Sequence, residues 1–177
     1  MMFAAISGEK SNGIDFCDKA LKAGANSILC NKKDFKKVLK KPANILITNN
    51  VRLSVSFIIK KLFPKQPKNI VAITGTNGKT SVAYYLKKLW ESANLKPASI
   101  GTLGVLYKNK KIPLNLTTPD PITLHKSIDA LKSKGVNYLA LEASSHGIEQ
   151  NRIDALKINR AIFSSFSRDH LDYHGTI

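Results

Sequence analysis

The sequence predicts an α/β protein with a small first domain and a second domain built on a doubly wound, mostly parallel sheet. Short apolar runs rich in β-branched residues alternate with segments of helical periodicity along the 177 residues. One such run, residues 70–73, leads into a glycine-rich loop and then into an apolar-periodic segment that reaches Ala93. Hydrophobic residues make up 43% of the chain, which is enough for a globular core.

The first 64 residues are expected to form a β-α-β-α-β-α domain. Gly24 stands where the first helix should end, because glycine adopts the left-handed conformation of a helix C-terminus without strain. Pro64 and Pro67 interrupt the pattern, so a linker is expected at residues 65–68. The expected strands are residues 2–6, 26–30 and 45–48, and the expected helices are residues 14–23, 34–39 and 51–63.

The second domain is expected at residues 69–177. A hairpin is predicted around Asn109-Lys110, between two short apolar strands. A helix capped by either Asp120 or Thr123 should run to Lys134 and end at Gly135. The expected strands are residues 70–73, 98–101, 105–107, 111–114, 138–141 and 160–163, and the helix after the glycine loop is expected at residues 79–93. Ligands of such a sheet gather at the carboxyl ends of its parallel strands.

The glycine loop at residues 74–78 predicts a phosphate site. Its glycines let backbone N–H groups approach an anion, the following helix adds partial positive charge, and Lys79 adds a full one. The hydroxyl of Thr80 or Ser81 would stand where a nucleotide-bound Mg²⁺ needs an oxygen ligand. The loop is shorter than the general G-x-x-x-x-G-K-[ST] pattern, because Ile73 occupies the place of its first glycine. A chance turn is the alternative, but the strand before the loop and the lysine after it favour a nucleotide-phosphate site.

Carboxylates and hydroxyls follow other predicted strands. Glu142 ends the strand at residues 138–141, where a carboxylate could bind Mg²⁺ beside the phosphate loop; capping a helix is the alternative. Residues 169–174 offer two carboxylates and two imidazoles, or simply a solvated polar loop. Thr117 and Thr118 precede a helix N-terminus, which favours an anion. These positions predict a polar site at the carboxyl edge of the sheet.

A further group of polar residues follows the strand that ends at Glu142. Arg152, with Gln150 nearby, could hold a carboxylate, because a guanidinium binds carboxylates in a bidentate manner. His146 lies in the same stretch, and a lone histidine is more often structural than catalytic. The stretch therefore predicts a place for an acidic substrate.

The net charge of +16 invites a nucleic-acid interpretation, but the charge pattern argues against it. The lysines are scattered over predicted helices and loops and form no arginine-rich patch interleaved with stacking aromatic residues. No apolar run approaches the roughly 20 residues that cross a bilayer, so membrane insertion is not expected. Cys17 and Cys30 lack metal-site spacing and are expected to be buried free thiols of a reducing cytoplasm.

Four stretches together resemble the Mur ligase family. They are Ile73-Thr-Gly-Thr-Asn-Gly-Lys-Thr-Ser81, Thr117-Thr-Pro119, Glu142-Ala-Ser-Ser-His-Gly147 with Gln150 and Arg152, and Ser167-Arg-Asp-His-Leu-Asp-Tyr-His-Gly175. Residues 3–16 also resemble the family's uridine-nucleotide-binding first domain, entered partway through. The resemblance covers nearly the whole chain and looks most like the members that add a diamino acid to UDP-N-acetylmuramoyl-L-alanyl-D-glutamate.

The resemblance implies a role for each matching residue, with ATP and Mg²⁺ as cofactors. Those that would bind the ATP phosphates are Gly75, Thr76, Asn77, Gly78, Lys79, Thr80 and Ser81. Those that would hold magnesium are Thr80, Glu142 and His170, and the catalytic set would be Lys79, Glu142 and His170. Those that would bind the muramoyl-dipeptide substrate are Thr117, Thr118, Ser144, Gln150 and Arg152.

The implied reaction is ATP-dependent amide ligation through an acyl phosphate, with meso-diaminopimelate or L-lysine as the added amino acid. The chain resembles a partial first domain and a partial ATPase domain, truncated at both ends and lacking the acceptor domain, so it is expected to be a monomeric cytoplasmic fragment that is inactive alone. Ser165 stands where the family commonly has asparagine. A folylpolyglutamate synthase-like ligase and a nucleotide-binding remnant without catalysis are the alternatives.

Overall fold

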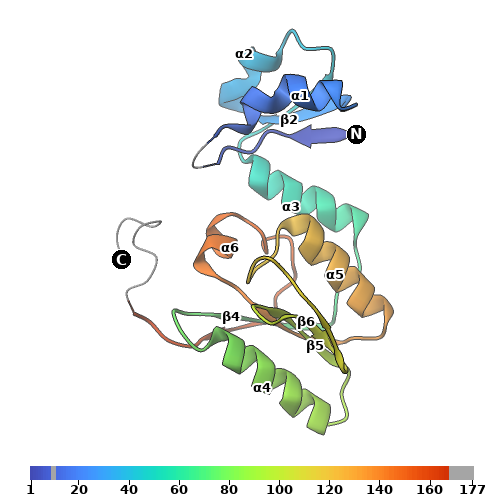
Figure 1. The fold of residues 1–177 in the computed structure, drawn as a ribbon, viewed down its shortest axis with the longest axis vertical. Coiled ribbons are helices and arrows are strands. Elements are labelled where there is room, and N and C mark those ends of the chain that lie inside the picture. The colour runs from blue at the N-terminus through green and yellow to red at the C-terminus, as the bar shows by residue number, and fades with distance from the viewer. Residues whose placement is uncertain (9–10, 168–177) are drawn as a thin grey trace. The chain divides into compact units, whose positions relative to one another are not determined.

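The structure is a computed structural model that describes residues 1–8 and 11–167. It divides into two compact units, Met1–Val55 and Ser56–Ile177, and each is described by itself (Figure 1). No helix in the described part of the chain is long and apolar enough to cross a membrane.

The first unit is a three-stranded parallel sheet with short helices, in the strand order β1-β2-β3. The strands are β1 (Met2–Ala4), β2 (Ser27–Asn31) and β3 (Asn44–Thr48); the helical segments are η1 (Gly13–Phe16), α1 (Cys17–Lys22), η2 (Lys32–Asp34), α2 (Phe35–Val38) and the start of α3 (Val51–Leu62). The predicted alternation is confirmed, although the first predicted helix opens as a 3-10 turn in which Ile14 N–H donates to the side chain of Asn12.

The core of the first unit forms around β2. Ile28 and Cys30 are fully buried and pack with Ile14, Cys17 and Val38. Both cysteines are free and buried, as the sequence predicts, and burial raises the pKa of each thiol. The thiols therefore pack as small apolar groups.

The boundary between the two units falls inside α3, after Val55. Residues 65–68, predicted as a linker, lie within the second unit and bond to other parts of it: Lys65 N–H donates to Asp129 Oδ1 at 2.9 Å, and Gln66 Oε1 accepts from Lys157 N–H at 3.3 Å. The linker assignment stays a prediction.

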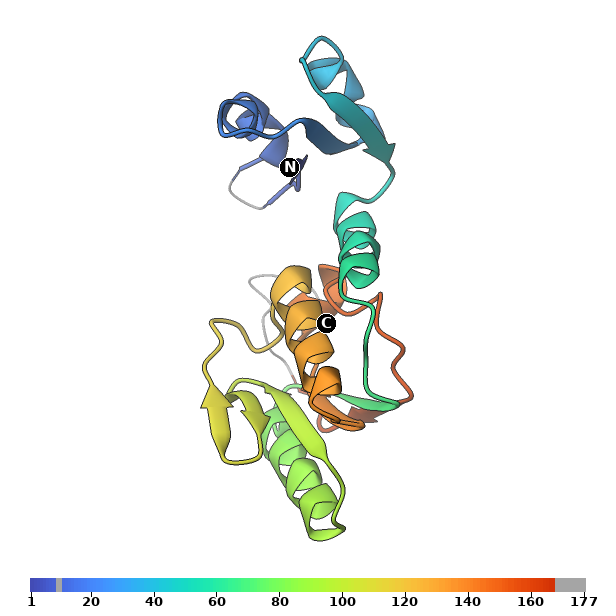
Figure 2. The ribbon, with the colours of Figure 1, turned by 90° about the vertical axis from the view of Figure 1, so that its right-hand side faces the viewer.

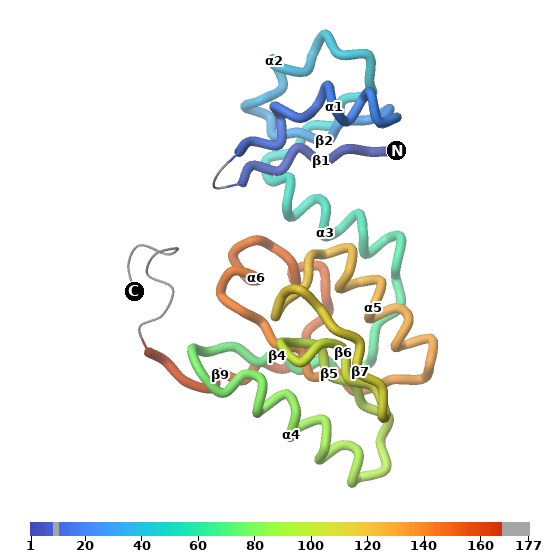
Figure 3. Tube along the Cα trace, in the orientation of Figure 1, coloured from blue at the N-terminus to red at the C-terminus, as the bar shows by residue number. Residues whose placement is uncertain are grey.

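The second unit is built on a six-stranded sheet in the order β7-β6-β5-β8-β4-β9. Five of its strands, β4, β5, β6, β7 and β9, are labelled in Figure 3. The strands are β4 (Asn69–Thr74), β5 (Pro97–Gly101), β6 (Gly104–Tyr107), β7 (Lys110–Ile112), β8 (Tyr138–Glu142) and β9 (Arg160–Phe163). The pairs β5·β8, β8·β4 and β4·β9 are parallel, and β6 and β7 add an antiparallel hairpin. This confirms the mostly parallel sheet. The predicted turn was displaced by one residue, because Tyr107 pairs with Lys110 and leaves Lys108-Asn109 as the turn.

Helices α4 (Lys79–Ser92) and α5 (Pro121–Ser133) cover opposite faces of this sheet (Figures 1 and 2). Because side chains alternate along a strand, β4 supplies both faces. Val71 and Ile73 pack with Ala83 of α4, whereas Ile70 packs with Leu124 of α5. The predicted double winding is thereby confirmed.

Helix ends follow the sequence signals in α5. Asp120 caps the helix by accepting from the N–H groups of Ile122 and Thr123 at 2.9 and 3.0 Å, and Pro121 opens the first turn. Of the two caps that the sequence allowed, Asp120 is therefore the one used. Gly135 follows the helix with φ of 84°, the left-handed conformation expected there. One short helix, α6 (Ser145–Glu149), was not predicted.

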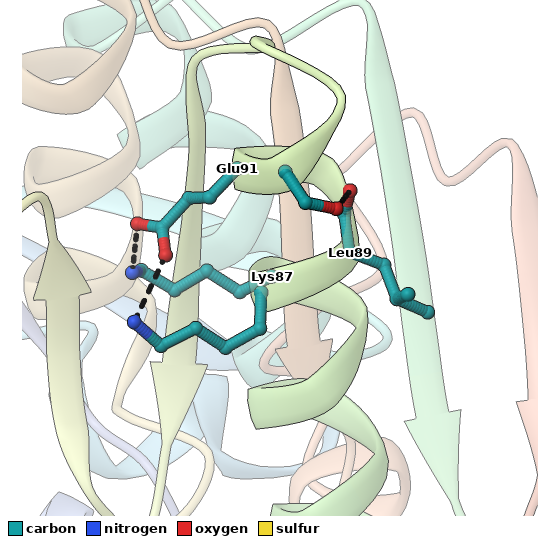
Figure 4. A network of polar contacts seen from close by, with 5 residues as sticks. Lys87, Leu89 and Glu91 are labelled. Atoms are coloured by element: carbon teal, nitrogen blue, oxygen red, sulfur yellow. Dashed lines mark hydrogen bonds and ion pairs between the residues drawn. The ribbon is translucent and has the colours of Figure 1, made fainter.

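A polar network lies in the last turns of α4 (Figure 4). Lys87 is buried, and its ammonium group is ion-paired with Glu91, which Lys88 also reaches at 3.2 Å. Burial raises the pKa of Glu91, but the hydrogen bonds from Lys87 and Lys88 outweigh burial and hold that pKa below its usual range. The network secures a buried cation on the helix face that approaches the sheet.

Candidate functional site

The carboxyl ends of four adjacent strands, β5, β8, β4 and β9, form a row at one edge of the sheet. The glycine loop follows β4, and the segments after β8 and β9 flank it on either side. Because parallel strands end at the same edge, residues far apart in the sequence meet here. The candidate site is built from these strand ends.

The glycine loop adopts a conformation that requires glycine. Gly75 and Gly78 have φ of 124° and 85°, in the left-handed region. A Cβ on Gly75 would lie 2.5 Å from Ser164 Oγ, so close approach also excludes a side chain. Gly78 is the N-cap of α4, and within residues 11–167 no side chain caps this 14-residue helix, an arrangement in which backbone N–H groups can bind an anion.

Ser164 and Ser165, which follow β9, form hydrogen bonds to the glycine loop. Ser164 Oγ lies 2.9 Å from Thr74 O and 2.6 Å from Asn77 O. Ser165 Oγ accepts from Asn77 N–H at 2.9 Å and lies 3.1 Å from Asn77 O. Sequence reasoning did not find these loop contacts, since the serines lie almost 90 residues from the loop. Ser165, the position at which the sequence departs from the resemblance, therefore contacts the loop directly.

Lys79 lies folded over the loop that precedes it. Its ammonium group donates to the carbonyl oxygens of Gly75 and Thr76 at 2.6 and 2.9 Å. These bonds hold a positive charge beside the N–H groups in the first turn of α4. The arrangement concentrates positive potential where a phosphate chain would lie.

Glu142 ends β8 as a buried carboxylate surrounded by neutral donors. Its Oε2 accepts from the hydroxyls of Thr80 and Thr102 at 2.9 and 3.1 Å, and its Oε1 accepts from Thr102 N–H at 3.0 Å. In the described part of the chain, none of the ion pairs involves Glu142. A buried carboxylate with hydroxyl and amide donors but no cation is well suited to receive one.

The described residues contain no group of three or more metal-binding side chains. This donor set nevertheless suits Mg²⁺, which is commonly held by one or two protein oxygens together with substrate phosphates and water. Thr80 and Glu142 provide such a pair, with their oxygens 2.9 Å apart. His170, the third metal ligand implied by the resemblance, and the cluster at residues 169–174 lie outside the described residues.

Thr117 and Thr118 occupy different environments. Thr117 is partly buried, and its hydroxyl lies 3.0 Å from that of Thr102. Thr118 is fully buried: its hydroxyl donates to Glu142 O at 2.9 Å and accepts from Ser144 N–H at the same distance. Ser144 Oγ lies 3.0 Å from the Thr118 hydroxyl and caps α6 by accepting from Gly147 N–H at 3.2 Å. The Thr118 side chain thus joins the end of β8 to the start of α6.

Arg152 is oriented by two oxygen acceptors. Its guanidinium donates to Thr118 O at 2.6 Å and to Gln150 Oε1 at 2.7 Å. Gly147 makes this corner possible, because a Cβ there would lie 2.6 Å from the Thr118 side chain. The structure therefore brings together Thr118, Ser144, Gln150 and Arg152, while Ser81 is exposed on α4.

The chain is an α/β protein, and a glycine loop at the carboxyl edge of a doubly wound sheet, with a lysine and a carboxylate beside it, is typical of α/β proteins that bind phosphate groups. A family model of the Mur ligase middle domain matches residues 73–177. The chain belongs to the Mur ligase family.

Curated relatives and solved structures agree with this assignment. The chain is 39% identical over 177 residues to the UDP-N-acetylmuramoyl-L-alanyl-D-glutamate--2,6-diaminopimelate ligase of Mesorhizobium japonicum, covering 100% of this chain and 36% of the relative. It is 42% identical over 176 residues to the ligase of the same name from Zymomonas mobilis, covering 99% and 35%. A solved structure of a ligase of that name superposes with a TM-score of 0.79 at 30% identity, covering 99% and 35%.

A second solved structure, the MurF ligase from Thermotoga maritima in complex with ADP, superposes with a TM-score of 0.61 at 20% identity, covering 99% of this chain and 36% of that one. This likeness supports the fold alone. The chain spans about a third of the length of the curated relatives that it matches.

Proposed function

We propose that the chain provides the nucleotide site and much of the muramoyl-peptide site of an ATP-dependent ligase of peptidoglycan precursor synthesis. The observation that carries the proposal is the row of strand ends at which Lys79 and the glycine loop, the Thr80–Glu142 pair, and the Thr118–Ser144–Arg152 corner lie side by side. The names of the relatives favour UDP-N-acetylmuramoyl-L-alanyl-D-glutamate as the acceptor of a diamino acid, with 2,6-diaminopimelate preferred over L-lysine.

The phosphates of ATP would lie on residues 75–81, against the α4 N-terminus. Lys79 offsets the charge of the phosphates, and the hydroxyl of Thr80 with the carboxylate of Glu142 would hold Mg²⁺. When bound, the metal neutralises charge on the transferring phosphoryl group. The role of His170 rests on the resemblance.

The proposed reaction first brings together two anionic groups, the γ-phosphate of ATP and the γ-carboxylate of the D-glutamate, and the amine reacts afterwards. The γ-phosphoryl group of ATP would pass to the γ-carboxylate of the D-glutamate and leave ADP. An amine of the diamino acid would then attack the acyl phosphate, forming the amide and releasing phosphate and a proton. Arg152, already oriented by Gln150 and Thr118, would hold the substrate through a carboxylate. Thr117 and Ser144 would complete this side of the site.

The first unit supports a second part of the proposal. A structure of a named ligase matches 99% of the chain, so Met1–Val55 lies within the matched region, and we assign it to uridine-nucleotide binding. Buried free thiols suit a reducing compartment, and we propose a cytoplasmic monomer. Because the chain spans a third of its relatives, we propose that these residues alone bind nucleotide without forming an amide.

Nucleotide binding by the chain tests the proposal. Isothermal titration with ATP in the presence of Mg²⁺ should show binding, and Lys79→Ala should weaken it at least tenfold, because a charge-assisted contact contributes about 1.5–3 kcal/mol. Lys88→Ala is the matched control, since Lys88 lies on the same helix with a side chain 53% exposed. Failure of the unmodified chain to bind ATP, or equal binding by Lys79→Ala, would contradict the nucleotide site.

Substrate choice separates the ligase classes. A version extended to the full length of the relatives should release phosphate with the uridine-linked muramoyl dipeptide and a diamino acid. Turnover with folate alone would instead identify a folylpolyglutamate synthase-like enzyme, and turnover with neither would identify a nucleotide-binding remnant.

A further inference from the structure

Thr102 lies in the first position after β5 and belongs to none of the stretches that carry the family resemblance. Its backbone N–H and its hydroxyl both reach the carboxylate of Glu142, one at each oxygen. Its hydroxyl also lies 3.0 Å from that of Thr117. Thr102 therefore touches both the proposed metal ligand and the proposed substrate side of the site.

The close approach of these groups depends on Gly101. A Cβ at that position would lie 2.0 Å from Glu142 Oε1, so only glycine lets the carboxylate lie flat against the end of β5. With the backbone of Gly101 beside it and Thr80 on its other flank, the Glu142 carboxylate is fixed by Thr102 at both oxygens. Each of these bonds reduces the freedom of a side chain that would have to meet a metal in one orientation.

The hydroxyl protons of Thr102 and Thr117 determine which group donates in each hydrogen bond. A threonine hydroxyl has one proton and two lone pairs, and an ionised carboxylate only accepts. Thr102 donates its proton to Glu142 Oε2, so the contact between Thr117 and Thr102 must use the proton of Thr117. The chain therefore runs from Thr117 to Thr102 to Glu142, and the remaining lone pairs of Thr117 can accept from an N–H or O–H group.

We propose that Thr102 is a positioning residue for the reaction of this family: it orients the Glu142 carboxylate toward the metal and leaves Thr117 as a hydrogen-bond acceptor for the substrate. The inference rests on the proposed function, because it assigns Glu142 to Mg²⁺. Groups that orient metal ligands in this way typically change metal affinity by about 10- to 100-fold when they are removed.

Magnesium dependence of nucleotide binding by the chain tests this assignment. Thr102→Val keeps the shape and the backbone N–H but removes the hydroxyl. The Mg²⁺ concentration that gives half-maximal enhancement of ATP binding should rise about 10- to 100-fold, while ATP binding measured in EDTA should stay within about twofold of the unmodified chain. Thr102→Ser restores a hydroxyl and should return the Mg²⁺ dependence to within about threefold.

The outcomes separate this inference from the proposed function. If the unmodified chain binds ATP without any response to Mg²⁺, the proposed metal site fails. If it responds and Thr102→Val responds at the same Mg²⁺ concentration, the positioning role alone is overturned. A loss of binding in EDTA as well, or failure of serine to rescue, would show a purely structural role and would also overturn it.

Discussion

At the scale of single residues, the Lys87–Glu91 pair shows that a buried charge needs a partner of opposite charge. Lys87 has a side chain 3% exposed, whereas that of Glu91 is 30% exposed. Glu91→Gln would leave a buried ammonium group with no carboxylate, a change that costs about 3–5 kcal/mol at fully buried pairs. Because Glu91 is partly solvated, we expect a loss of about 2 kcal/mol in the free energy of unfolding, measured by urea denaturation.

Lys88 provides the matched control for that experiment. Its side chain is 53% exposed and pairs with the same carboxylate, so Lys88→Gln should cost less than about 0.5 kcal/mol. The pKa of Glu91 is lowered in the folded chain, so its contribution is complete above about pH 4.3 and is lost as the pH falls through the folded value. If Glu91→Gln and Lys88→Gln lowered the free energy of unfolding equally, leaving the buried Lys87 without a carboxylate would have no measurable cost.

His125 should make the free energy of unfolding depend on pH in a mildly acidic range, above the range in which Glu91 acts. It is buried in α5, and its Nε2 has no hydrogen-bond partner among the described residues. Burial and then the nearby Lys60 ammonium lower its pKa. The folded chain therefore resists protonation, and the free energy of unfolding should fall as the pH drops below about 6.5, the unfolded value.

Urea denaturation at pH 7.5 and pH 5.5 measures this effect. The decrease in stability between the two pH values should be smaller in His125→Leu, which cannot be protonated. Lys60→Gln removes one of the causes of the lowered pKa and should also reduce the decrease. The same decrease in all three proteins would assign it to other groups.

At the scale of elements, α5 offers a test of how a helix begins. Asp120 accepts from two of the backbone N–H groups that a helix leaves unpaired, so Asp120→Ala should destabilise the chain by about 1 kcal/mol in thermal or urea unfolding. Thr123→Ala is the control, because its hydroxyl does not serve as the cap and alanine favours helix. A larger loss in the Thr123 variant would mean that the cap is misassigned.

Elements with strong local signals could be predicted from the sequence. The apolar run that forms β4, the caps of α5 and the left-handed Gly135 are local features, and the structure places each within a residue or two of its expected position. Helix α6 was missed because five residues give no helical periodicity, and Ser144 was considered only as a site residue and not also as the cap of a helix. The hairpin turn moved by one residue because strand register depends on pairing as well as on composition.

The site could be predicted in part for the same reason. Lys79, Thr80 and Glu142 stand at fixed places relative to strands that the sequence reveals, so their convergence follows from the sheet edge. Thr102 carries no local signal: its contact with Glu142 arises from the register that sets the end of β5 beside the end of β8. Ser164 and Ser165 reach the loop only because β9 pairs with β4.

At the scale of the whole molecule, the two units divide the chain inside α3 and each has its own sheet and core. The sequence revealed the two alternating patterns. The division between the two units inside α3 could not be predicted from the sequence. A continuous amphipathic helix does not indicate which of its turns pack against the first core and which against the second. Contacts between distant residues decide that question.

The outer strand of the larger sheet has a consequence for behaviour in concentrated solution. All of β7 is exposed, and Lys110 and Lys111 occupy two of its three positions. A free strand edge can capture the edge of another copy, but here such pairing would bring ammonium groups together. At physiological ionic strength charges are screened over about 8 Å, farther than the spacing of paired strands, so the repulsion persists at contact. Higher salt should therefore weaken this repulsion and favour pairing between copies at the exposed edge of β7.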